Sequence, residues 1–171
     1  MINIALYEPE IPPNTGNIIR LCANTGSILH LIKPLGFNLD DKQLRRAGLD
    51  YREYAEVKTY DSYKQMLDII NPETTYLFTT KGSLPHSEVK YKPKDLLVFG
   101  PETRGLPNKI LTTVDENHRI RIPMLHQSRS LNLSNAAAIA VYEAWRQFGY
   151  QSAIIEPYLR GEPFLQDPAD K

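Results

Sequence analysis

The sequence has little of several features that would each narrow its class. Cys22 is the single cysteine among 171 residues, which excludes an intrachain disulfide and fits a reducing compartment. No apolar run approaches the roughly 20 residues that cross a bilayer, and the N-terminal segment lacks the basic and long apolar regions of a signal peptide. We therefore expect a soluble cytoplasmic protein that does not associate with membranes.

An excess of charge of one sign is also absent, because 20 Lys and Arg balance 20 Asp and Glu. Net charge therefore neither identifies nor excludes a nucleic-acid partner, since local patches steer such ligands. The four histidines have no ligand-like spacing with one another or with Cys22, so we expect no metal site. The length is that of one domain, enough to bury roughly 70% of the unfolded surface.

Short apolar runs alternate with helix-like patterns, which is typical of an α/β fold. The sequence has no internal repeat and matches neither GxxxxGK nor GxGxxG, which weakens kinase, GTPase and dinucleotide-dependent dehydrogenase interpretations. Buried strands are predicted at residues 2–7, 28–33, 57–60, 75–80, 95–100 and 118–124.

Helices are predicted between most of these strands, at residues 14–26, 40–48 and 61–70 and in a short segment after Pro107. Asp61 is the expected N-cap of the third of them. One more helix is predicted at residues 133–148.

The helix at residues 133–148 has one apolar stripe and further apolar residues on its other faces. The stripe consists of Ala138, Val141, Trp145 and Phe148. A helix of this kind is buried on several sides, and in so small a domain the second partner could be another copy of the chain. We expect one domain over residues 1–155, and an extended or partly disordered, proline-containing tail over residues 156–171.

The segment PPNTGNIIRLCANTG, residues 12–26, feeds a turn into a helix whose first backbone N–H groups could hold an anion. Arg20 lies within two helical turns of Asn14, so both side chains could address one ligand. The alternative is that Asn14 only caps the helix and Arg20 is a solvated surface residue.

The segment FGPETRGLP, residues 99–107, follows a buried strand, at the end where parallel sheets bind ligands. Gly100 and Gly105 would let the backbone approach a ligand closely, and Glu102 lies between them. A loop that merely needs positive φ is the alternative.

The segment HRIRIPMLHQSRSLNLSN, residues 118–135, is locally positive, because no Asp or Glu occurs between Asn117 and Tyr142. Its last eight residues include five Ser or Asn, whereas capping a helix needs one such side chain. Alternating arginines on an edge strand, with Asn132 or Ser134 as the cap, would explain part of this pattern. The remaining Ser and Asn residues indicate a site.

In order and spacing, these three segments resemble the three motifs of the SPOUT class of RNA methyltransferases. The matching stretches are Asn14 to Arg20, FGPETRGLP, and IRIPM followed by SRSLNLSNAAAIAVYEAWRQ. The resemblance covers close to the first 150 residues and includes no separate RNA-binding domain. Within the class, the sequence is similar to the type that methylates the 2′-oxygen of tRNA nucleotide 34, a cytidine or uridine, with leucine tRNAs as the expected substrates.

The resemblance implies a SPOUT-type α/β sheet flanked by helices, with a C-terminal segment threaded through a loop to form a deep trefoil knot. It also implies a homodimer built on the first and last helices. The knot would enclose S-adenosylmethionine, converted to S-adenosylhomocysteine in the reaction. The cofactor contacts implied in this way are Phe78, Thr79, Gly100, Gly105, Ile122, Met124, Ser130 and Leu131.

The residues that match the catalytic positions of such enzymes are Arg20, Asn14, Glu102, Ser130 and Asn132. A guanidinium stays protonated under nearly all conditions, so we interpret Arg20 as stabilising negative charge and not as a base. Candidate RNA contacts are Arg20, Arg121, Arg129, Lys81 and Arg104. The expected partner is the tRNA anticodon arm, bound in a cleft that joins Arg20 of one subunit to the cofactor pocket of the other.

Three other functions stay open on the sequence. The chain could methylate another tRNA or ribosomal RNA position, or it could be a knotted RNA-binding protein without activity. It could also be a small-molecule enzyme with an α/β nucleotide pocket, although the missing glycine-rich motifs argue against that.

Overall fold

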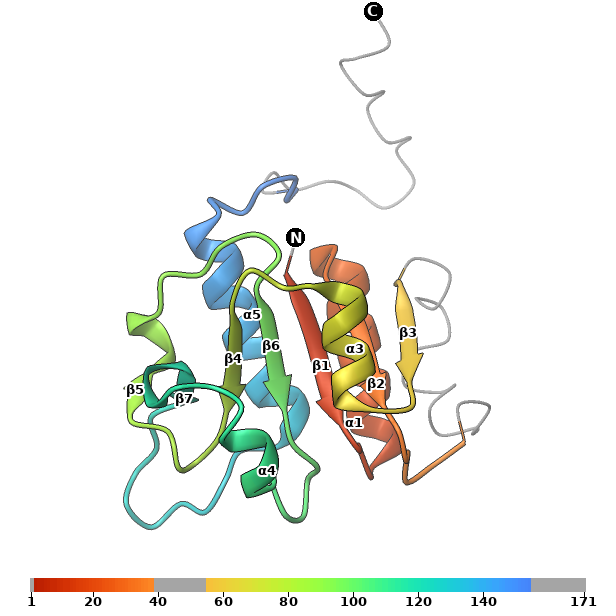
Figure 1. The fold of residues 1–171 in the computed structure, drawn as a ribbon. Helices are drawn as coiled ribbons and strands as arrows, with labels where there is room; N and C mark the ends of the chain where they lie inside the picture. The colour runs from red at the N-terminus through yellow and green to blue at the C-terminus, as the bar shows by residue number, and fades with distance from the viewer. Residues whose placement is uncertain (1, 39–54, 155–171) are drawn as a thin grey trace, which may run out of the picture.

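Within residues 2–38 and 55–154, which the structure, a computed structural model, describes, seven parallel strands form one sheet (Figure 1). The strand order is β3, β2, β1, β6, β4, β7, β5. The strands are β1 (Asn3–Tyr7), β2 (Ile28–Ile32), β3 (Val57–Tyr60), β4 (Thr75–Phe78), β5 (Leu84–Pro85), β6 (Leu96–Phe99) and β7 (Arg119–Arg121).

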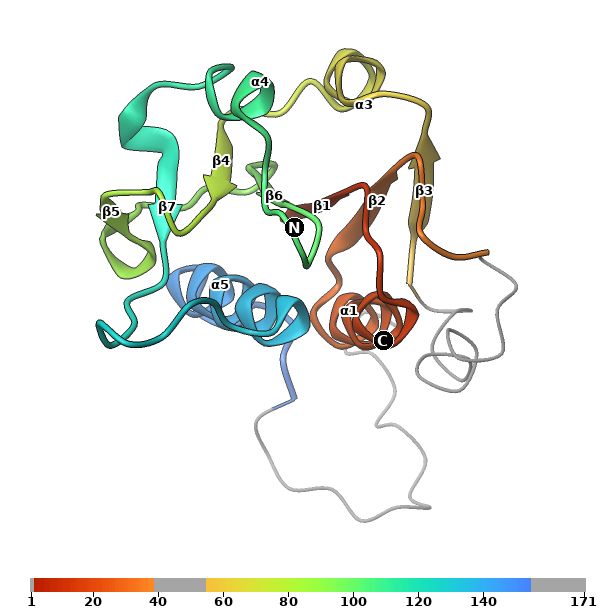
Figure 2. The ribbon, with the colours of Figure 1, turned by 90° about the horizontal axis from the view of Figure 1, so that it is seen from below.

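The helices in the described part of the chain form two layers on the sheet (Figure 2). Helices α1 and α5 lie side by side on one face, while α3 and α4 cover the other. The α-helices are α1 (Pro12–Thr25), α3 (Tyr63–Ile70), α4 (Asn108–Leu111) and α5 (Leu133–Gln147), with 3₁₀ turns at η2 (His86–Glu88) and η3 (Glu116–His118). This arrangement confirms the α/β prediction.

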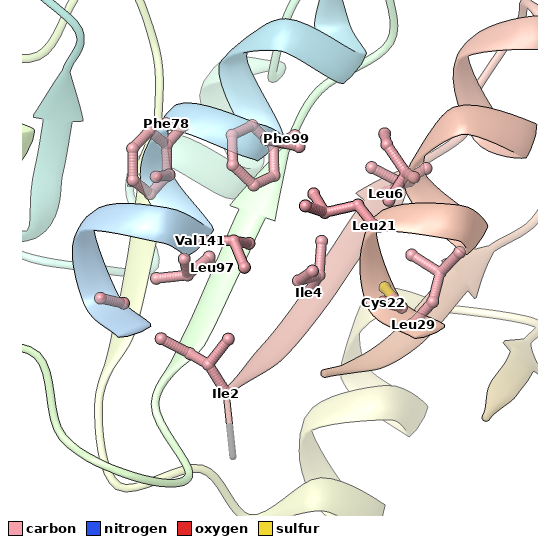
Figure 3. Close-up of a cluster of buried hydrophobic side chains, with 14 of the residues drawn as sticks. Ile2, Ile4, Leu6, Leu21, Cys22, Leu29, Phe78, Leu97, Phe99 and Val141 are labelled. Carbon is pink, nitrogen blue, oxygen red and sulfur yellow. The ribbon is translucent and has the colours of Figure 1, made fainter. Parts of the chain in front are cut away.

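The central strands of the sheet, such as β1 and β6, are buried on both faces, and their side chains alternate between the two layers. Along β1, Ile4 and Leu6 join the cluster under α1 and α5, whereas Ala5 and Tyr7 join the cluster under α3 and α4. Figure 3 shows the first cluster, in which Val141 of α5 lies near strand residues such as Leu97. Burial on both faces explains why the strands read as continuous apolar runs.

Six predicted strands are confirmed, and β5 was missed. This strand has only two residues and pairs at the sheet edge, where Leu84 lies opposite Ile120. Two residues are too few to show an alternating pattern, and Pro85 is compatible with an edge strand. The helix predicted at residues 40–48 and the tail at residues 156–171 lie outside the described residues.

Two predicted helix starts were wrong. Helix α1 begins at Pro12 and not near Asn14, because proline has no N–H to lose and its φ suits a first turn. Helix α3 is capped by Ser62, whose Oγ accepts the backbone N–H of Gln65 at 3.1 Å. Asp61 instead forms an ion pair of 2.9 Å with Lys33.

The predicted stripe of α5 was only partly correct. The buried residues are Leu133, Ala137, Ala140, Val141 and Ala144, so the packed face is rotated from the prediction. Ile139 and Tyr142 are 38% and 45% exposed. The small residues let α5 approach the sheet and α1 closely, while Ile139 and Tyr142 leave apolar side chains on the exposed face.

No helix in residues 2–38 and 55–154 is both long enough and apolar enough to cross a membrane.

His30 forms a buried cluster of polar side chains with Asn3 and Tyr60. Its Nε2 lies 3.1 Å from Asn3 Oδ1 and its Nδ1 lies 2.9 Å from the Tyr60 hydroxyl. Because an amide oxygen only accepts, Nε2 carries the proton, and the hydroxyl donates to Nδ1. Burial lowers the pKa of His30 to about 4, and the charge of Lys58 acts in the same direction.

This cluster predicts a stability that depends on pH. The unfolded chain protonates His30 below pH 6.5, whereas the folded protein does so only near pH 4. The free energy of unfolding should therefore fall between pH 6.5 and 4, by up to about 3 kcal/mol. Urea unfolding of the wild type and of His30→Gln at several pH values measures the difference, and parallel pH profiles would contradict the assignment.

Candidate active site

The loops that follow β4, β6 and β7 enclose a cavity of about 590 Å³ at the carboxyl ends of these strands. In Figure 1 these strand ends face the long loop that leads into α5. Parallel α/β sheets bind ligands at this edge. All eight residues predicted to contact a cofactor line the cavity: Phe78, Thr79, Gly100, Gly105, Ile122, Met124, Ser130 and Leu131.

Two stacked aromatic rings form an apolar part of the cavity wall. Phe78 ends β4 and Phe99 ends β6, and their ring centroids are 4.6 Å apart with planes 20° from parallel. The rings lie side by side because the two strands pair in register at these residues. Figure 3 shows both rings above the aliphatic core. The rigid sheet thus fixes this wall.

Gly100 is required by a close approach of two backbone segments. A Cβ at this position would lie 2.4 Å from the Leu106 nitrogen and 2.5 Å from the Gly105 carbonyl carbon. Gly105 has a φ of +66°, which L residues rarely adopt. The two glycines therefore allow the segment between them to fold back tightly along the cavity.

Glu102 joins this loop to the start of α1. Its carboxylate accepts the backbone N–H of Glu10 at 2.8 Å, the N–H of Ile11 at 3.1 Å, and the Asn14 side-chain amide at 2.9 Å. A negative charge is favourable at a helix N-terminus, where backbone N–H groups lack partners. Glu102 therefore holds the loop after β6 against the start of α1. It does not cap α4, because Pro107 precedes that helix and no side-chain cap is present there.

Asn14 and Asn132 extend this connection to α5. The Asn132 side chain donates from Nδ2 to Asn14 Oδ1 at 2.9 Å, and its Oδ1 accepts the Ser134 backbone N–H at 2.9 Å. Asn132 is therefore the N-cap of α5, as the alternative interpretation held, and also a contact to α1. Asn14 lies inside α1, so the interpretation of Asn14 as a plain helix cap is wrong.

The remaining polar residues of SRSLNLSN have separate positions. Ser130 lines the cavity, as do Arg129, Leu131 and Asn132. The Ser134 hydroxyl reinforces the cap by donating to Asn132 Oδ1 at 2.7 Å. The Ser and Asn residues of this segment therefore cap α5, link it to α1 and form part of the cavity wall.

The predicted basic residues divide between the cavity and the surface. Lys81, Arg104, Arg121 and Arg129 line the cavity, whereas Arg20 lies on an exposed part of α1 and does not. We expected Asn14 and Arg20 to address one ligand, but within one chain only Asn14 lines the cavity. Arg121 donates to the Thr80 carbonyl, and Lys81 donates to Asn108 Oδ1 at 3.3 Å.

Sequence reasoning missed the partners of Arg104. Its guanidinium pairs with Glu10 at 2.9 Å and with Glu8 at 2.6 Å. Glu8 has a φ of +48°, in the left-handed region that few non-glycine residues adopt. These partners lie more than 90 residues away in sequence, so no local pattern relates them.

Arg119 serves the fold. It donates from Nε to the Leu111 carbonyl at 3.0 Å and from Nη2 to the Val114 carbonyl at 3.3 Å, and thereby satisfies the C-terminal end of α4 and the turn that follows. The arginines of the locally positive segment, residues 118–135, are therefore only partly available to contact a ligand. Among the residues that the structure describes, no group of three or more His, Cys, Asp or Glu could hold a metal ion.

The family model of the SpoU rRNA Methylase family matches residues 1–142. The chain belongs to this methylase family. The resemblance drawn from the three motifs is therefore confirmed, and the cavity is the one that those motifs surround in this fold.

Relatives of this chain match it over nearly their whole length. The tRNA (cytidine(34)-2′-O)-methyltransferase of Escherichia coli is 59% identical over 155 residues, covering 91% of this chain and 99% of that protein. The protein of that name from Yersinia pestis is 58% identical over 161 residues, with the same coverage. A structure solved for the 2-OH methylation of C/U34 on tRNA has a TM-score of 0.83 and 40% identity, covering 88% of this chain and 98% of that one.

The tight approach at Gly100 predicts a local defect on substitution. In Gly100→Ala the added Cβ would overlap backbone atoms of Gly105 and Leu106, so the loop must move. We expect affinity for S-adenosylmethionine to fall by at least about tenfold, measured by titration calorimetry. Gly149→Ala is the control, because Gly149 has a φ of +68° but no neighbour within 4 Å of an added Cβ.

The control should lose about 1 kcal/mol of stability through backbone strain and bind like the wild type. Equal affinities for the Gly100→Ala and Gly149→Ala variants would contradict the role given to the loop.

Proposed function

We propose that the protein transfers a methyl group from S-adenosylmethionine to the 2′-oxygen of nucleotide 34, cytidine or uridine, in the anticodon arm of tRNA, with leucine tRNAs as substrates. The observation that carries the proposal is one cavity lined by all eight predicted cofactor residues and by Asn14, Glu102, Ser130 and Asn132. The names and the extent of the relatives support the same reaction. As a tRNA-modifying enzyme, it would act in the cytoplasm.

The cavity suits the cofactor in size and in chemistry. A volume of about 590 Å³ lies within the range of small-molecule sites. Ile122 and Leu131 offer apolar surface to an adenine ring, while the loop from Gly100 to Gly105 brings backbone groups to the cavity. When bound, the cofactor supplies a methyl group on a positively charged sulfur, open to attack by an oxygen.

The chain's own residues would orient the ribose and help its hydroxyl to lose a proton. A 2′-hydroxyl is a weak nucleophile until deprotonation begins. Ser130, at the cavity wall, is a candidate to hold that hydroxyl. Asn14 and Asn132 are already hydrogen bonded to each other, so they would fix the geometry of the site and not abstract the proton.

Arg20 would stabilise the developing oxyanion and bind a nucleotide phosphate. Because it does not line the cavity of its own chain, we propose that it acts on the cavity of a second copy. The exposed apolar residues Ile139 and Tyr142 support a homodimer built on α5 and the adjacent α1. Arg121, Arg129 and Lys81 would contact further phosphates of the anticodon arm.

We further propose that residues 1–155 form one domain closed by a deep trefoil knot. Support comes from the way the chain returns on itself: Ile122 and Met124 line the cavity beside the Gly100 loop, and Asn132 then reaches Asn14 near the N-terminus. The knot would hold the cavity walls without help from a ligand.

Methyl transfer to total tRNA from a strain lacking this protein tests the proposed function. The protein is incubated with labelled S-adenosylmethionine, and the modified nucleoside is identified and mapped by mass spectrometry. We expect 2′-O-methylcytidine or 2′-O-methyluridine at position 34. Because the matching family model is that of ribosomal RNA methylases, ribosomal RNA is tested in parallel. Methylation of ribosomal RNA alone, or none with cofactor bound, would reject position 34.

Mixed dimers test the shared site. One protomer carries Arg20→Ala and the other carries Gly100→Ala. If Arg20 acts on the partner's cavity, each mixed dimer holds one intact site and should methylate tRNA at about half the wild-type rate. If Arg20 acts within its own chain, the mixed dimer should be as inactive as the two parent variants.

A further inference from the structure

Two glutamates from distant segments each hold the backbone of the other's segment. Glu102 accepts the N–H groups of Glu10 and Ile11. Glu10 in turn accepts the Thr103 backbone N–H at 3.1 Å and the Thr103 hydroxyl at 2.6 Å through Oε2. The segment before α1 and the loop after β6 are therefore joined in both directions.

Arg104 adds an ionic contact to this junction. Nη1 donates to Glu10 Oε1 at 2.9 Å and Nη2 donates to Glu8 Oε2 at 2.6 Å. The two carboxylate side chains are only 23% and 20% exposed, whereas the Arg104 side chain is 56% exposed. Hydrogen bonding from Thr103 lowers the pKa of Glu10, with Arg104 acting in the same direction. Glu10 is thus ionised and engaged through both oxygens.

Neither Glu8 nor Glu10 lines the cavity, but the loop that they hold does, from Gly100 to Leu106. This loop contains no helix or strand, and within it the N–H of Gly105 donates to the Pro101 carbonyl at 2.9 Å. Ordering such a segment costs conformational entropy for each residue. A ligand that had to order the loop would bind more weakly by that cost.

We infer that Glu10 and Arg104 are positioning residues that hold the loop from Gly100 to Gly105 in its ligand-binding conformation. The inference rests on the proposed function for the identity of the ligand. It gives Arg104 a role other than the phosphate contact predicted from sequence, because both ends of its guanidinium are engaged by carboxylates.

Substitution of Glu10 tests the inference. In Glu10→Ala every contact to Thr103 and Arg104 is lost, whereas Glu10→Gln keeps one acceptor oxygen and loses the charge. We expect affinity for S-adenosylhomocysteine, measured by calorimetry, to fall about tenfold in Glu10→Ala and less in Glu10→Gln. In tRNA methylation the KM for the cofactor should rise by a similar factor, while kcat stays within about twofold.

Glu73→Ala is the matched control. Glu73 pairs with Lys92 at 2.8 Å. It precedes the amino end of β4, whereas the cavity lies at the carboxyl end of that strand. The control removes an exposed ion pair of similar length without touching the loop. It should bind S-adenosylhomocysteine like the wild type.

Hydrogen exchange gives a measurement that does not depend on a ligand. The Thr103 amide should exchange faster in Glu10→Ala than in the wild type or in Glu73→Ala. If Glu10→Ala fails to fold, Thr103→Val takes its place. This variant removes only the hydroxyl contact to Glu10, so we expect the same changes in exchange and affinity, but smaller ones. Unchanged exchange and unchanged affinity would overturn the inference.

Arg104→Gln separates positioning from RNA contact. A lost phosphate contact would lower the salt dependence of tRNA affinity by about one unit of slope. We expect that slope to stay the same and affinity for S-adenosylhomocysteine to fall. The reverse result would overturn the inference.

If the wild type binds no S-adenosylhomocysteine, the proposed function fails, and the exchange of Thr103 still decides whether Glu10 holds the loop.

Discussion

The side-chain amide of Asn14 joins two walls of the cavity that lie far apart in sequence. It donates to Glu102 and accepts from Asn132, at 2.9 Å in each case. The polarity is forced, because a carboxylate only accepts and because Asn132 Oδ1 is occupied by the N-terminal N–H groups of α5. An aspartate at position 14 would place two carboxylates together. The start of α1, the loop after β6 and the start of α5 therefore depend on one amide.

The parallel sheet makes this junction possible. Because all seven described strands run in one direction, the ends of β4, β6 and β7 meet at one edge, and their loops can share a cavity. Phe78 and Phe99 extend the rigid core into the cavity wall. Asn14, Glu102 and Asn132 form a hydrogen-bonded polar part of the same wall. Rigid aromatic contacts below and oriented amides above would let the site hold a ribose hydroxyl near a cofactor without large rearrangement.

Periodicity and local chemistry predicted much of this fold. Six strands followed from apolar runs, and the three segments singled out around Asn14, Glu102 and Asn132 meet at one cavity. Strand β5 was missed because two residues carry no pattern. The pairing of Glu10 with Arg104 was missed because 94 residues separate them. Tertiary packing decides the start of α1, the packed face of α5 and the position of Arg20 outside the cavity. Helix propensity alone therefore could not predict them.

The most direct test of the central junction is a rescue measured as affinity for S-adenosylhomocysteine. Asn14→Asp should bind much more weakly than the wild type, because it sets a carboxylate against Glu102. Adding Glu102→Gln supplies an N–H donor to that carboxylate and keeps an oxygen that accepts the Glu10 N–H, at the cost of the acceptor for the Ile11 N–H. We expect the double variant to bind S-adenosylhomocysteine more tightly than Asn14→Asp alone. A double variant that binds as weakly as Asn14→Asp, or more weakly, would contradict it.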